Sequence, residues 1–448
     1  MERNTINLLS FGAAIKNNTF NYMPSLDEAG RRTSIVSRIV SGQDRTDRKA
    51  DGTKKILLGD TEMAISMQNP IALGIIGGGQ LGKMIAQEAK RMSLKVIILD
   101  PSHDCPASFV SDEIIVADFK DEAAIRKLAA MSDVVTYEIE LANSTALKDL
   151  ESEKYPVYPS PVTLRLIQNK YRQKSFLKDN NISVAKFDIV SSQPQLEQLC
   201  EEYGFPAMLK ASENSYDGRG NFLITSRDNI KQGLLTFQGK ECMLEKFIPF
   251  VKEISVMTAR NPSGQIESFP VAENIHFNNI LDMTIVPARI SDKILAKAQN
   301  LAQKTLAALK GAGIFGIEMF VLPDEDVVIN EIAPRPHNSG HYSIEACSLS
   351  QFEQHIRALL DLPLSKPRLL SPAVMLNLLG PENGSGTYKI VGLKELFSIP
   401  GLKLHVYGKK ISKPRRKLGH ITITSQTVED AISKAERARK VVKIVLDC

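Results

Sequence analysis

Hydrophobic and polar positions alternate between strand and helix patterns from residue 71 onward. The apolar run Ile71–Ile76 predicts a strand, and Leu81–Met92 predicts an amphipathic helix because its apolar residues recur at helical spacing. Strands alternating with helices are typical of a parallel sheet, so residues 70–164 are predicted to form a doubly wound α/β domain. The other elements expected there are strands over Lys95–Leu99, Glu113–Ala117 and Asp133–Tyr137 and a helix over Glu122–Met131.

The pattern becomes mixed after Tyr155–Pro161, where three prolines indicate a boundary. A helix is expected over Leu164–Asn180, and residues 165–371 are predicted to form an α+β domain. Its further elements are strands over Ala207–Lys210, Phe222–Thr225, Cys242–Phe247 and Glu253–Ala259 and helices over Gln195–Tyr203 and Ile294–Leu309. Residues 372–448 are predicted to form a small α/β domain, with strands over Ala373–Leu379, Lys403–Tyr407 and Gly419–Thr424 and a helix over Val428–Val441.

Residues 1–69 differ from the rest of the chain. They show no sustained helix or strand period and are rich in polar residues, which predicts a disordered extension. The alternative is a start codon assigned too early, since Met63 and Met67 both precede the first expected strand. The acidic residues of this segment argue against an organelle transit peptide.

Composition excludes several classes of protein. A length of 448 residues with 24% charged and 43% hydrophobic residues predicts two to four globular domains. A formal net charge of only +5 gives no support for nucleic-acid binding, and no apolar run approaches the ~20 residues of a membrane span. Five cysteines without a CxxC pair argue against a disulfide framework and a structural zinc site, so we expect a cytoplasmic protein.

A glycine loop joins the first strand to the first helix. Gly77, Gly79 and Gly82 match GxGxxG, and Asp100 ends the next strand, as in a dinucleotide site. The same loop is also expected wherever a strand turns tightly into a helix. The residues of this region leave both interpretations open.

A second glycine loop, residues 215–221, follows the apolar strand that ends at Lys210. Backbone amides together with a lysine charge can hold phosphate oxygens, so this pair predicts a phosphate site. The alternative is an ordinary hairpin beside a solvated lysine.

Carboxylates occur within apolar runs at Glu245, Glu253, Glu318 and Glu331. Burying such a group is costly unless it meets a cation. Two acids on adjacent strands suit Mg²⁺ bound to nucleotide phosphates, and internal salt bridges are the alternative.

The loop Ala333–His341 contains one arginine, two histidines and one asparagine, with Arg335 between two prolines. This set of donors can bind an oxyanion. The alternative is a loop of this composition by chance.

These motifs together resemble the ATP-grasp superfamily and, within it, the 5-(carboxyamino)imidazole ribonucleotide synthases of purine biosynthesis. The resemblance covers about Ile71 to Thr424. It implies an ATP-grasp fold with an N-terminal Rossmann-like domain and a small C-terminal domain. The matching segments are Gly77–Gly82, Val135–Glu140, Ser215–Gly220, Glu253–Val256, Asn330–His341, Ser350–Glu353 and Arg416–His420.

The resemblance also implies a reaction. ATP, bicarbonate and 5-aminoimidazole ribonucleotide would give the carboxyamino product, ADP and phosphate through carboxyphosphate, with Mg²⁺ (or Mn²⁺) as cofactor. A homodimer is expected from the family, as is a separate carboxyaminoimidazole ribonucleotide mutase as functional partner. The glycine loop at Gly77 would frame the ribonucleotide pocket and would not bind NAD.

Carried over residue by residue, the resemblance assigns three groups of side chains. The ATP site would comprise Lys170, Lys210, Ser215, Tyr216, Asp217, Gly218, Arg219, Gly220, Asn221, Glu245, Lys246, Phe247, Ile248, Glu253, His276, Asn330 and Glu331. The metal would be held by Glu318, Glu331 and Asn330. The ribonucleotide and bicarbonate would be bound by Glu138, Tyr216, Asp217, Arg219, Arg335, His337, Asn338, Lys409 and Arg416.

The chain departs from the family pattern at a few positions. Lys170 stands where arginine is common, which keeps the charge but loses the planar fork. Leu141 replaces a common asparagine and so lacks its amide, while Arg219 and Asn221 replace lysine and glutamine.

Three other functions are alternatives for this chain. Another ATP-grasp ligase, such as a formate-dependent glycinamide ribonucleotide transformylase, would not explain His337 and Asn338. An NAD-dependent oxidoreductase built on Gly77 and Asp100 would leave Lys210, Glu318 and Glu331 unused. A non-catalytic scaffold would have no use for buried acids that cost stability.

Overall fold

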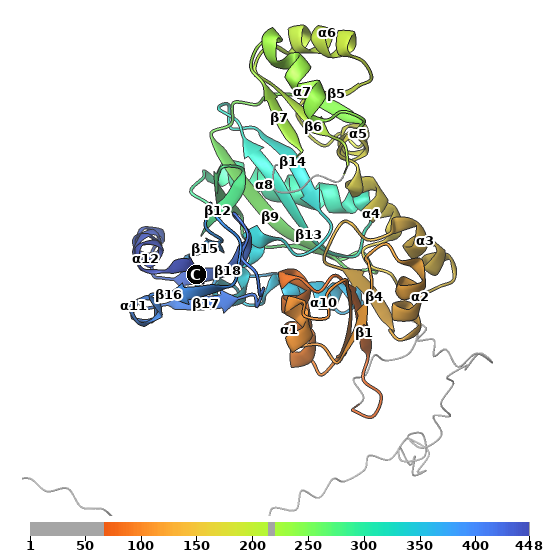
Figure 1. Cartoon of the computed structure of the whole chain (residues 1–448), viewed down its shortest axis with the longest axis vertical. Helices are drawn as coiled ribbons and strands as arrows, with labels where there is room; N and C mark the ends of the chain where they lie inside the picture. Colours follow the sequence, from red (N-terminus) through yellow and green to blue (C-terminus); the bar gives the residue numbers. More distant parts are fainter. Residues whose placement is uncertain (1–66, 214–219, 448) are drawn as a thin grey trace, which may run out of the picture. The chain divides into compact units, whose positions relative to one another are not determined.

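The computed structural model describes residues 67–213 and 220–447 (Figure 1). The chain divides into two compact units, Met1–Gly52 and Thr53–Cys448, and only the second contains described residues. The predicted extension of residues 1–69 therefore lies outside the described residues except at its last three positions. Within the described ranges, no helix is long and apolar enough to span a bilayer.

Residues 72–137 contain a parallel four-stranded sheet, whose strands lie in the order β3-β2-β1-β4. Alternate residues of β1 serve two cores: Leu73 and Ile75 pack with helix α1, while Ala72 and Ile76 pack with α2 and α3. This burial on both faces explains the uninterrupted apolar runs and confirms the predicted doubly wound arrangement. The elements are β1 (Ala72–Ile76), α1 (Gln80–Arg91), β2 (Lys95–Asp100), the 3₁₀ turn η2 (Pro106–Phe109), β3 (Glu113–Val116), α2 (Glu122–Ala130), β4 (Val134–Tyr137) and α3 (Ser144–Ser152).

The single helix predicted over Leu164–Asn180 is wrong. The structure has two helices, α4 (Pro161–Gln168) and α5 (Lys170–Asp179), which are separated at Asn169. Asn169 has an extended backbone, and its side-chain oxygen accepts a hydrogen bond from the Arg172 amide (2.9 Å). An asparagine that caps the following helix ends the preceding one, which the apolar period alone does not reveal.

A smaller antiparallel sheet, in the order β5-β8-β6-β7, carries two helices. Leu209 and Leu244 of its strands pack with Leu196 and Ile230 in one apolar core. Its elements are β5 (Phe187–Val190), α6 (Gln193–Tyr203), β6 (Ala207–Ala211), β7 (Asn221–Ile224), the 3₁₀ turn η3 (Arg227–Asn229), α7 (Ile230–Thr236) and β8 (Cys242–Lys246).

A nine-stranded sheet forms the largest element, in the order β14-β13-β9-β11-β12-β15-β18-β17, with β10 paired to β9 (Figure 1). Strand β12 pairs with β15, so the sheet continues across the boundary predicted near residue 372. Its strands are β9 (Lys252–Arg260), β10 (Ile266–Ser268), β11 (Ala272–Phe277), β12 (Ile280–Val286), β13 (Gly313–Val321), β14 (Val327–Ala333), β15 (Ala373–Leu379), β17 (Leu402–Val406) and β18 (Lys417–Thr424).

Helix α8 (Asp292–Leu309) packs on this sheet, and strands β16 (Tyr388–Val391) and β19 (Lys443–Leu446), which are distant in the chain, form a separate two-stranded antiparallel sheet. Helix α8 packs against β9 and β13 through Ala298, Ala302 and Leu306. The remaining elements are the 3₁₀ turn η4 (Asn338–Gly340), α9 (Ser343–Ala346), α10 (Gln351–Leu359), α11 (Leu393–Phe397) and α12 (Val428–Val441).

His355 of α10 joins the parallel sheet to the large sheet. Its Nδ1 accepts a hydrogen bond from the Ile314 amide of β13 (3.1 Å), and its Nε2 lies 3.2 Å from the Thr136 hydroxyl of β4. Burial lowers the pKa of His355 to about 3, because no described group compensates the buried charge. The folded protein therefore keeps this imidazole neutral where the unfolded chain takes up a proton.

This pKa difference predicts acid lability. The stability that the neutral His355 side chain contributes is complete above pH ~6.5 and is lost as the pH falls toward 3. Between pH 7.5 and 5.5, urea denaturation should show wild type losing about 1.4 kcal/mol more unfolding free energy than His355→Gln. Equal losses in both proteins would show that the pKa of His355 is the same in the folded and the unfolded state.

Candidate active site

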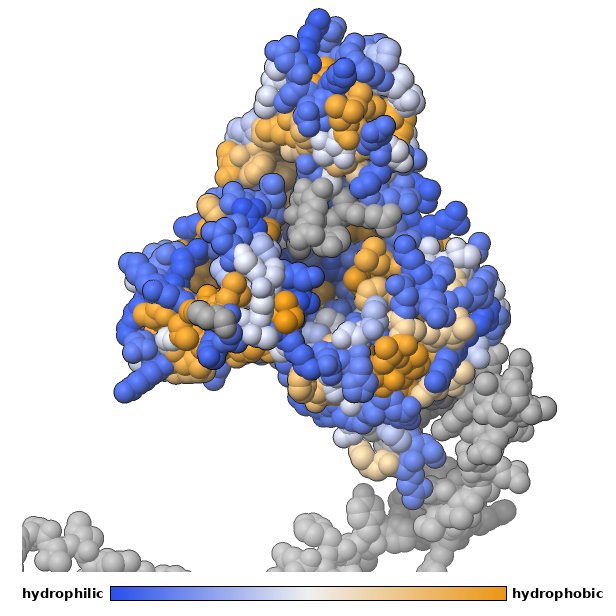
Figure 2. All heavy atoms as spheres, viewed as in Figure 1, coloured by the Kyte–Doolittle hydropathy of each residue, from blue (hydrophilic) through white to orange (hydrophobic). Residues whose placement is uncertain are grey.

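A large cleft of about 2010 Å³ brings together the parallel sheet, the small sheet, the large sheet and the segment before β18. In the space-filling view it is a hollow in the middle of the described region (Figure 2). Many predicted site residues line it: Glu138, Lys170, Lys210, Asn221, Glu245, Lys246, Phe247, Ile248, Glu253, His276, Glu318, Asn330, Glu331, Arg335, His337, Asn338, Lys409 and Arg416. The predicted residues Ser215, Tyr216, Asp217, Gly218 and Arg219 lie outside the described residues.

One carboxylate on the small sheet binds two lysines. Glu245 of β8 accepts from Lys210 of β6 (3.0 Å) and pairs with Lys174 of α5 (2.8 Å). Burial opposes ionisation of Glu245, but the two lysines outweigh it and lower its pKa to about 2. The side chain of Glu245 thus anchors the lysines, while the adjoining strand end, Lys246–Ile248, borders the cleft. Lys174 was not predicted, because within the helix it resembles any solvated lysine.

Apolar side chains line the same end of the cleft. Met208 of β6 and Leu223 of β7 come from the small sheet, and Phe320 of β13 comes from the large one. Phe320 stacks on Phe250, with ring centroids 4.4 Å apart and nearly parallel planes. An apolar slot between two sheets, next to a set of lysines, suits a planar aromatic base attached to phosphates. Asn221 also lines this end of the cleft, and the preceding residue, Gly220, accepts a hydrogen bond from the Ala211 amide through its carbonyl.

Two carboxylates face each other across strands β13 and β14. Glu318 and Glu331 are register partners, and an irregularity directly after them leaves Asn330 as the extra residue of β14. A bulge of this kind lets consecutive residues turn toward the same side, and both Asn330 and Glu331 line the cleft. Lys170 pairs with Glu331 (2.6 Å), placing the predicted phosphate lysine beside the predicted metal ligands.

This acidic pair fits a divalent cation. Burial and the negative charges of Glu331 and Glu253 raise the pKa of Glu318 to about 7, although His276 opposes the shift. A cation between the two carboxylates would relieve that repulsion. Among the described residues no three His, Cys, Asp or Glu side chains form a metal-binding group. Two carboxylates beside an asparagine suit Mg²⁺, which takes one or two carboxylates and completes its shell with water and phosphate oxygens.

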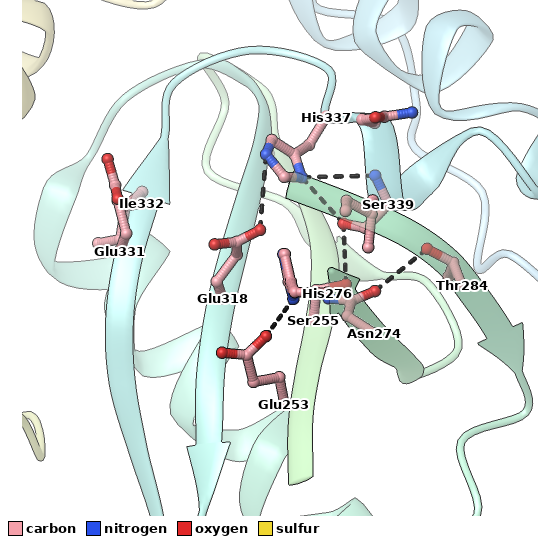
Figure 3. Close-up of polar contacts among 12 residues, drawn as sticks. Glu253, Ser255, Asn274, His276, Thr284, Glu318, Glu331, Ile332, His337 and Ser339 are labelled. Atoms are coloured by element: carbon pink, nitrogen blue, oxygen red, sulfur yellow. Dashed lines mark hydrogen bonds and ion pairs between the residues drawn. The ribbon is translucent and has the colours of Figure 1, made fainter. Parts of the chain in front are cut away.

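His276 and Glu253 form an ion pair at the base of this group (Figure 3). Burial opposes protonation of His276, but Glu253 outweighs it and raises the pKa of the imidazole. Since Glu253 is engaged by His276, its predicted contact with a ribose competes with this pair.

The loop Ala333–His341, called the Arg335 loop below, follows strand β14 and borders the cleft. Arg335 pairs with Glu140 of the segment after β4 (2.8 Å). The His337 Nε2 lies 3.6 Å from the Glu318 Oε1 (Figure 3). Burial, reinforced by Arg335, lowers the pKa of His337 well below its usual range, so this imidazole is neutral. The loop thus brings a neutral ring to Glu318 and a cation to Glu140, and both side chains line the cleft.

Asn338 is less available than the sequence indicates. Its amide forms two reciprocal hydrogen bonds with Asn377 of β15, at 3.0 and 2.8 Å. Asn377 also donates to the Leu281 carbonyl (2.7 Å), which fixes the orientation of the pair. The Asn338 side chain therefore keeps one amide hydrogen and one lone pair of its oxygen, and only the hydrogen suits an anionic ligand. Asn377 was not predicted, since nothing in its strand sequence distinguishes it.

The glycine loop at Gly77 is occupied by the chain's own carboxylates. Glu138 accepts from the amides of Gly79 (2.5 Å) and Gly82 (2.8 Å), and Asp100 accepts from the Gly78 amide (2.8 Å). These are the amides and the acid that a dinucleotide would need. The structure therefore argues against the NAD-binding alternative. It also places Glu138 at the cleft wall, where burial raises the pKa of its carboxyl group.

The segment before β18 supplies cations to the far end of the cleft. Lys409 donates to the Lys417 carbonyl (2.8 Å), and Arg416 donates to the Ile411 carbonyl (2.7 Å). Both side chains line the cleft, as do Lys410, Lys413, Arg415 and Lys417. This concentration of positive charge favours an anionic group at that end.

Three family models match successive parts of the chain. Residues 71–168 match a ribonucleotide synthetase preATP-grasp domain, residues 175–352 an ATP-grasp domain, and residues 373–434 a phosphoribosylaminoimidazole carboxylase C-terminal domain. The predicted fold class is confirmed by these matches.

Two curated relatives are similar to this chain over most of its length. The N5-carboxyaminoimidazole ribonucleotide synthase of Bacillus subtilis is 43% identical over 362 residues, which are 81% of this chain and 93% of the relative. The phosphoribosylaminoimidazole carboxylase of Ogataea methanolica is also 43% identical over 367 residues, which are 80% of this chain and 67% of that longer protein.

Solved structures agree with the curated relatives. N5-carboxyaminoimidazole ribonucleotide synthetase from Thermotoga maritima is 47% identical, covers 84% of this chain and 100% of its own, and superposes with a TM-score of 0.78. The synthase from Aspergillus clavatus in complex with ADP and 5-aminoimidazole ribonucleotide is 36% identical, with a TM-score of 0.77 over 84% of this chain and 99% of its own.

Proposed function

The chain belongs to the family of N5-carboxyaminoimidazole ribonucleotide synthases. We propose that the residues lining its cleft bind ATP, bicarbonate and 5-aminoimidazole ribonucleotide and join the last two. It is an ATP-dependent ligase of purine biosynthesis. The observation that carries the assignment of roles is the position of the Arg335 loop, directly beside the Glu318–Glu331 pair and Lys170. Bicarbonate, the phosphates of ATP and the amine of the ribonucleotide can come together at this position.

The nucleotide would lie between the two sheets. Met208, Leu223 and Phe320 would surround the adenine, and the strand end at Lys246–Ile248 would offer it backbone groups. Lys170, Lys210 and the loop 215–221 would hold the phosphates, and Glu253 the ribose hydroxyls. His276 would act through Glu253, with which it is paired.

Glu318, Glu331 and Asn330 would hold Mg²⁺, which neutralises the charge that builds up on the transferred phosphoryl group. Lys170 stabilises Glu331 as a carboxylate, since its charge outweighs the partial desolvation of this half-exposed side chain within the cleft and lowers the pKa of that group. The acid is therefore ionised and ready to act as a ligand.

Arg335 and His337 would bind bicarbonate, with a smaller contribution from Asn338. A bicarbonate oxygen attacks the γ-phosphorus and ADP leaves, which gives carboxyphosphate. The substrate amine then forms a bond to the carbon and loses a proton to the surrounding water. The carbon–oxygen bond to phosphate breaks either in this step or earlier, when carboxyphosphate releases CO₂, and inorganic phosphate departs. Arg335 keeps its charge throughout, and positioning with charge neutralisation is the main requirement of such a transfer.

The ribonucleotide would lie between the glycine loop and the segment before β18. Lys409 and Arg416 would hold its phosphate, and Glu138 would form one wall together with Tyr216, Asp217 and Arg219. A homodimer, a cytoplasmic location and a separate mutase that consumes the product belong to the same proposal.

Release of ADP from ATP and Mg²⁺ tests the function. We expect release that requires 5-aminoimidazole ribonucleotide and rises with added bicarbonate. Release with neither compound would indicate a generic ATPase, and release with formate and glycinamide ribonucleotide would indicate the other ATP-grasp ligase. Absence of release from every mixture would contradict the proposal.

A further inference from the structure

The His337 side chain packs directly against the backbone of strand β13 at Gly316. A Cβ atom built on Gly316 would lie 2.5 Å from the His337 Cβ and 2.9 Å from its Cγ, far inside van der Waals contact. Two residues further along the same strand, Glu318 faces the other side of the ring, 3.6 Å from Nε2. The missing side chain at Gly316 therefore lets the imidazole approach the strand and reach the carboxylate.

Gln351 fixes the backbone of the same residue. Its side-chain oxygen accepts from the His337 amide (2.9 Å), and its Nε2 donates to the His337 carbonyl (2.8 Å). Gln351 is fully buried at the start of α10, so the peptide on both sides of His337 is held by a rigid element. The backbone from which the ring projects is therefore fixed.

Hydrogen bonds to the ring determine where that proton lies. The Ser339 amide donates to the His337 Nδ1 (3.5 Å), and a backbone amide can only be a donor. The Ser339 hydroxyl lies 2.9 Å from the same nitrogen and accepts from the Ser255 hydroxyl of β9 (2.9 Å). A hydroxyl oxygen has two lone pairs, so the Ser339 hydroxyl can accept from Ser255 and still donate its own hydrogen. Because Nδ1 already accepts from the Ser339 amide, its 2.9 Å contact with the Ser339 hydroxyl is assigned as donation from that hydroxyl to Nδ1 (Figure 3).

We propose that Ser339 and Ser255 are positioning residues that hold His337 as a neutral imidazole with its proton on Nε2, pointing toward Glu318 and the reacting oxyanion. The proposal rests on the proposed function for the identity of that oxyanion. Both serines are buried, at 0% and 1% exposure, so water cannot replace either hydroxyl. They touch no ligand themselves and act through His337.

The proton on Nε2 matters because of what faces that nitrogen. With the proton on Nδ1, the Nε2 lone pair would face the Glu318 carboxylate and any bicarbonate beside it, and Nδ1 would oppose the Ser339 amide. With the proton on Nε2, the ring donates a hydrogen bond without adding a second full charge beside Arg335. Partners of this kind, which orient a functional imidazole, typically change activity 10- to 100-fold when removed.

Kinetics provide the first test. Ser339→Ala should lower kcat for ribonucleotide-dependent ADP release by about 10- to 100-fold and leave the KM for ATP unchanged. Ser255→Ala should show a smaller loss, because the Ser339 amide and hydroxyl remain. Thr258→Val is the matched control: it removes another buried hydroxyl from β9, one that pairs with Ser268. Wild-type kcat in Ser339→Ala, or an equal loss in Thr258→Val, would overturn the proposal.

Nitrogen NMR of ¹⁵N-histidine-labelled protein reads the tautomer directly. The chain has seven histidines, and His337→Gln identifies the signals of interest. We expect a protonated Nε2 in wild type and, in Ser339→Ala, an Nδ1 signal shifted toward that of a nitrogen accepting no hydrogen bond. A protonated Nδ1 in wild type, or an unmoved signal in the variant, would refute the inference. This readout needs no turnover, so it separates failure of the inference from failure of the proposed function.

Discussion

Replacing Glu331 with glutamine is expected to lower kcat by about 10³-fold or more, equivalent to about 4 kcal/mol of transition-state stabilisation. Glu331 is one of two carboxylates that face each other across β13 and β14, and it also pairs with Lys170. The amide retains the shape of the side chain but removes the charge that a cation and the lysine both need. Steady-state ADP release at saturating ATP and Mg²⁺ measures the effect.

The fold should survive this change. The Glu331 side chain is 46% exposed, so an amide there remains hydrated. Glu325→Gln is the control, because that glutamate forms an ion pair with Lys293 outside the cleft. Glu331→Gln with wild-type activity would contradict the assignment of the metal ligands. A cooperative unfolding transition near that of wild type would show that lost activity does not reflect lost structure.

Local patterns predicted much of the fold. The strand over Ala373–Leu379 and the helix over Val428–Val441 have the predicted bounds, because each carries its own apolar period between clear breaks. The continuation of the sheet from β12 to β15 was not predicted, since pairing depends on tertiary contacts between distant segments. The break at Asn169 was missed because a capping side chain leaves the surrounding apolar period intact.

The candidate site was predicted where its residues form motifs and missed where single side chains act at a distance. Glu318 and Glu331 were placed on adjacent strands, and the register confirms that pairing. Lys174 and Asn377 were missed: each has an ordinary local sequence, and each contacts a predicted residue more than 30 positions away. Glu138 shows a related limit, because its contact with the glycine loop spans 59 positions.

Replacing Arg335 is expected to affect bicarbonate more than ATP. Arg335→Met removes the cation two residues before the neutral His337, and we expect kcat/KM for bicarbonate to fall by about 10²- to 10³-fold. The KM for ATP should change little, because the lysines that would hold the phosphates lie on α5 and β6. Initial rates at varied bicarbonate, in buffer freed of dissolved CO₂, measure the effect.

Arg335→Lys separates charge from geometry. The guanidinium already pairs with Glu140 at 2.8 Å, and its planar fork can bind a carboxylate-like anion through two parallel hydrogen bonds. Lysine keeps the positive charge but offers a single point of contact. We therefore expect kcat/KM for bicarbonate between those of wild type and Arg335→Met. If lysine fully restores it, charge alone binds the anion; if both variants lose ATP affinity equally, Arg335 serves the nucleotide and the assignment to bicarbonate is wrong.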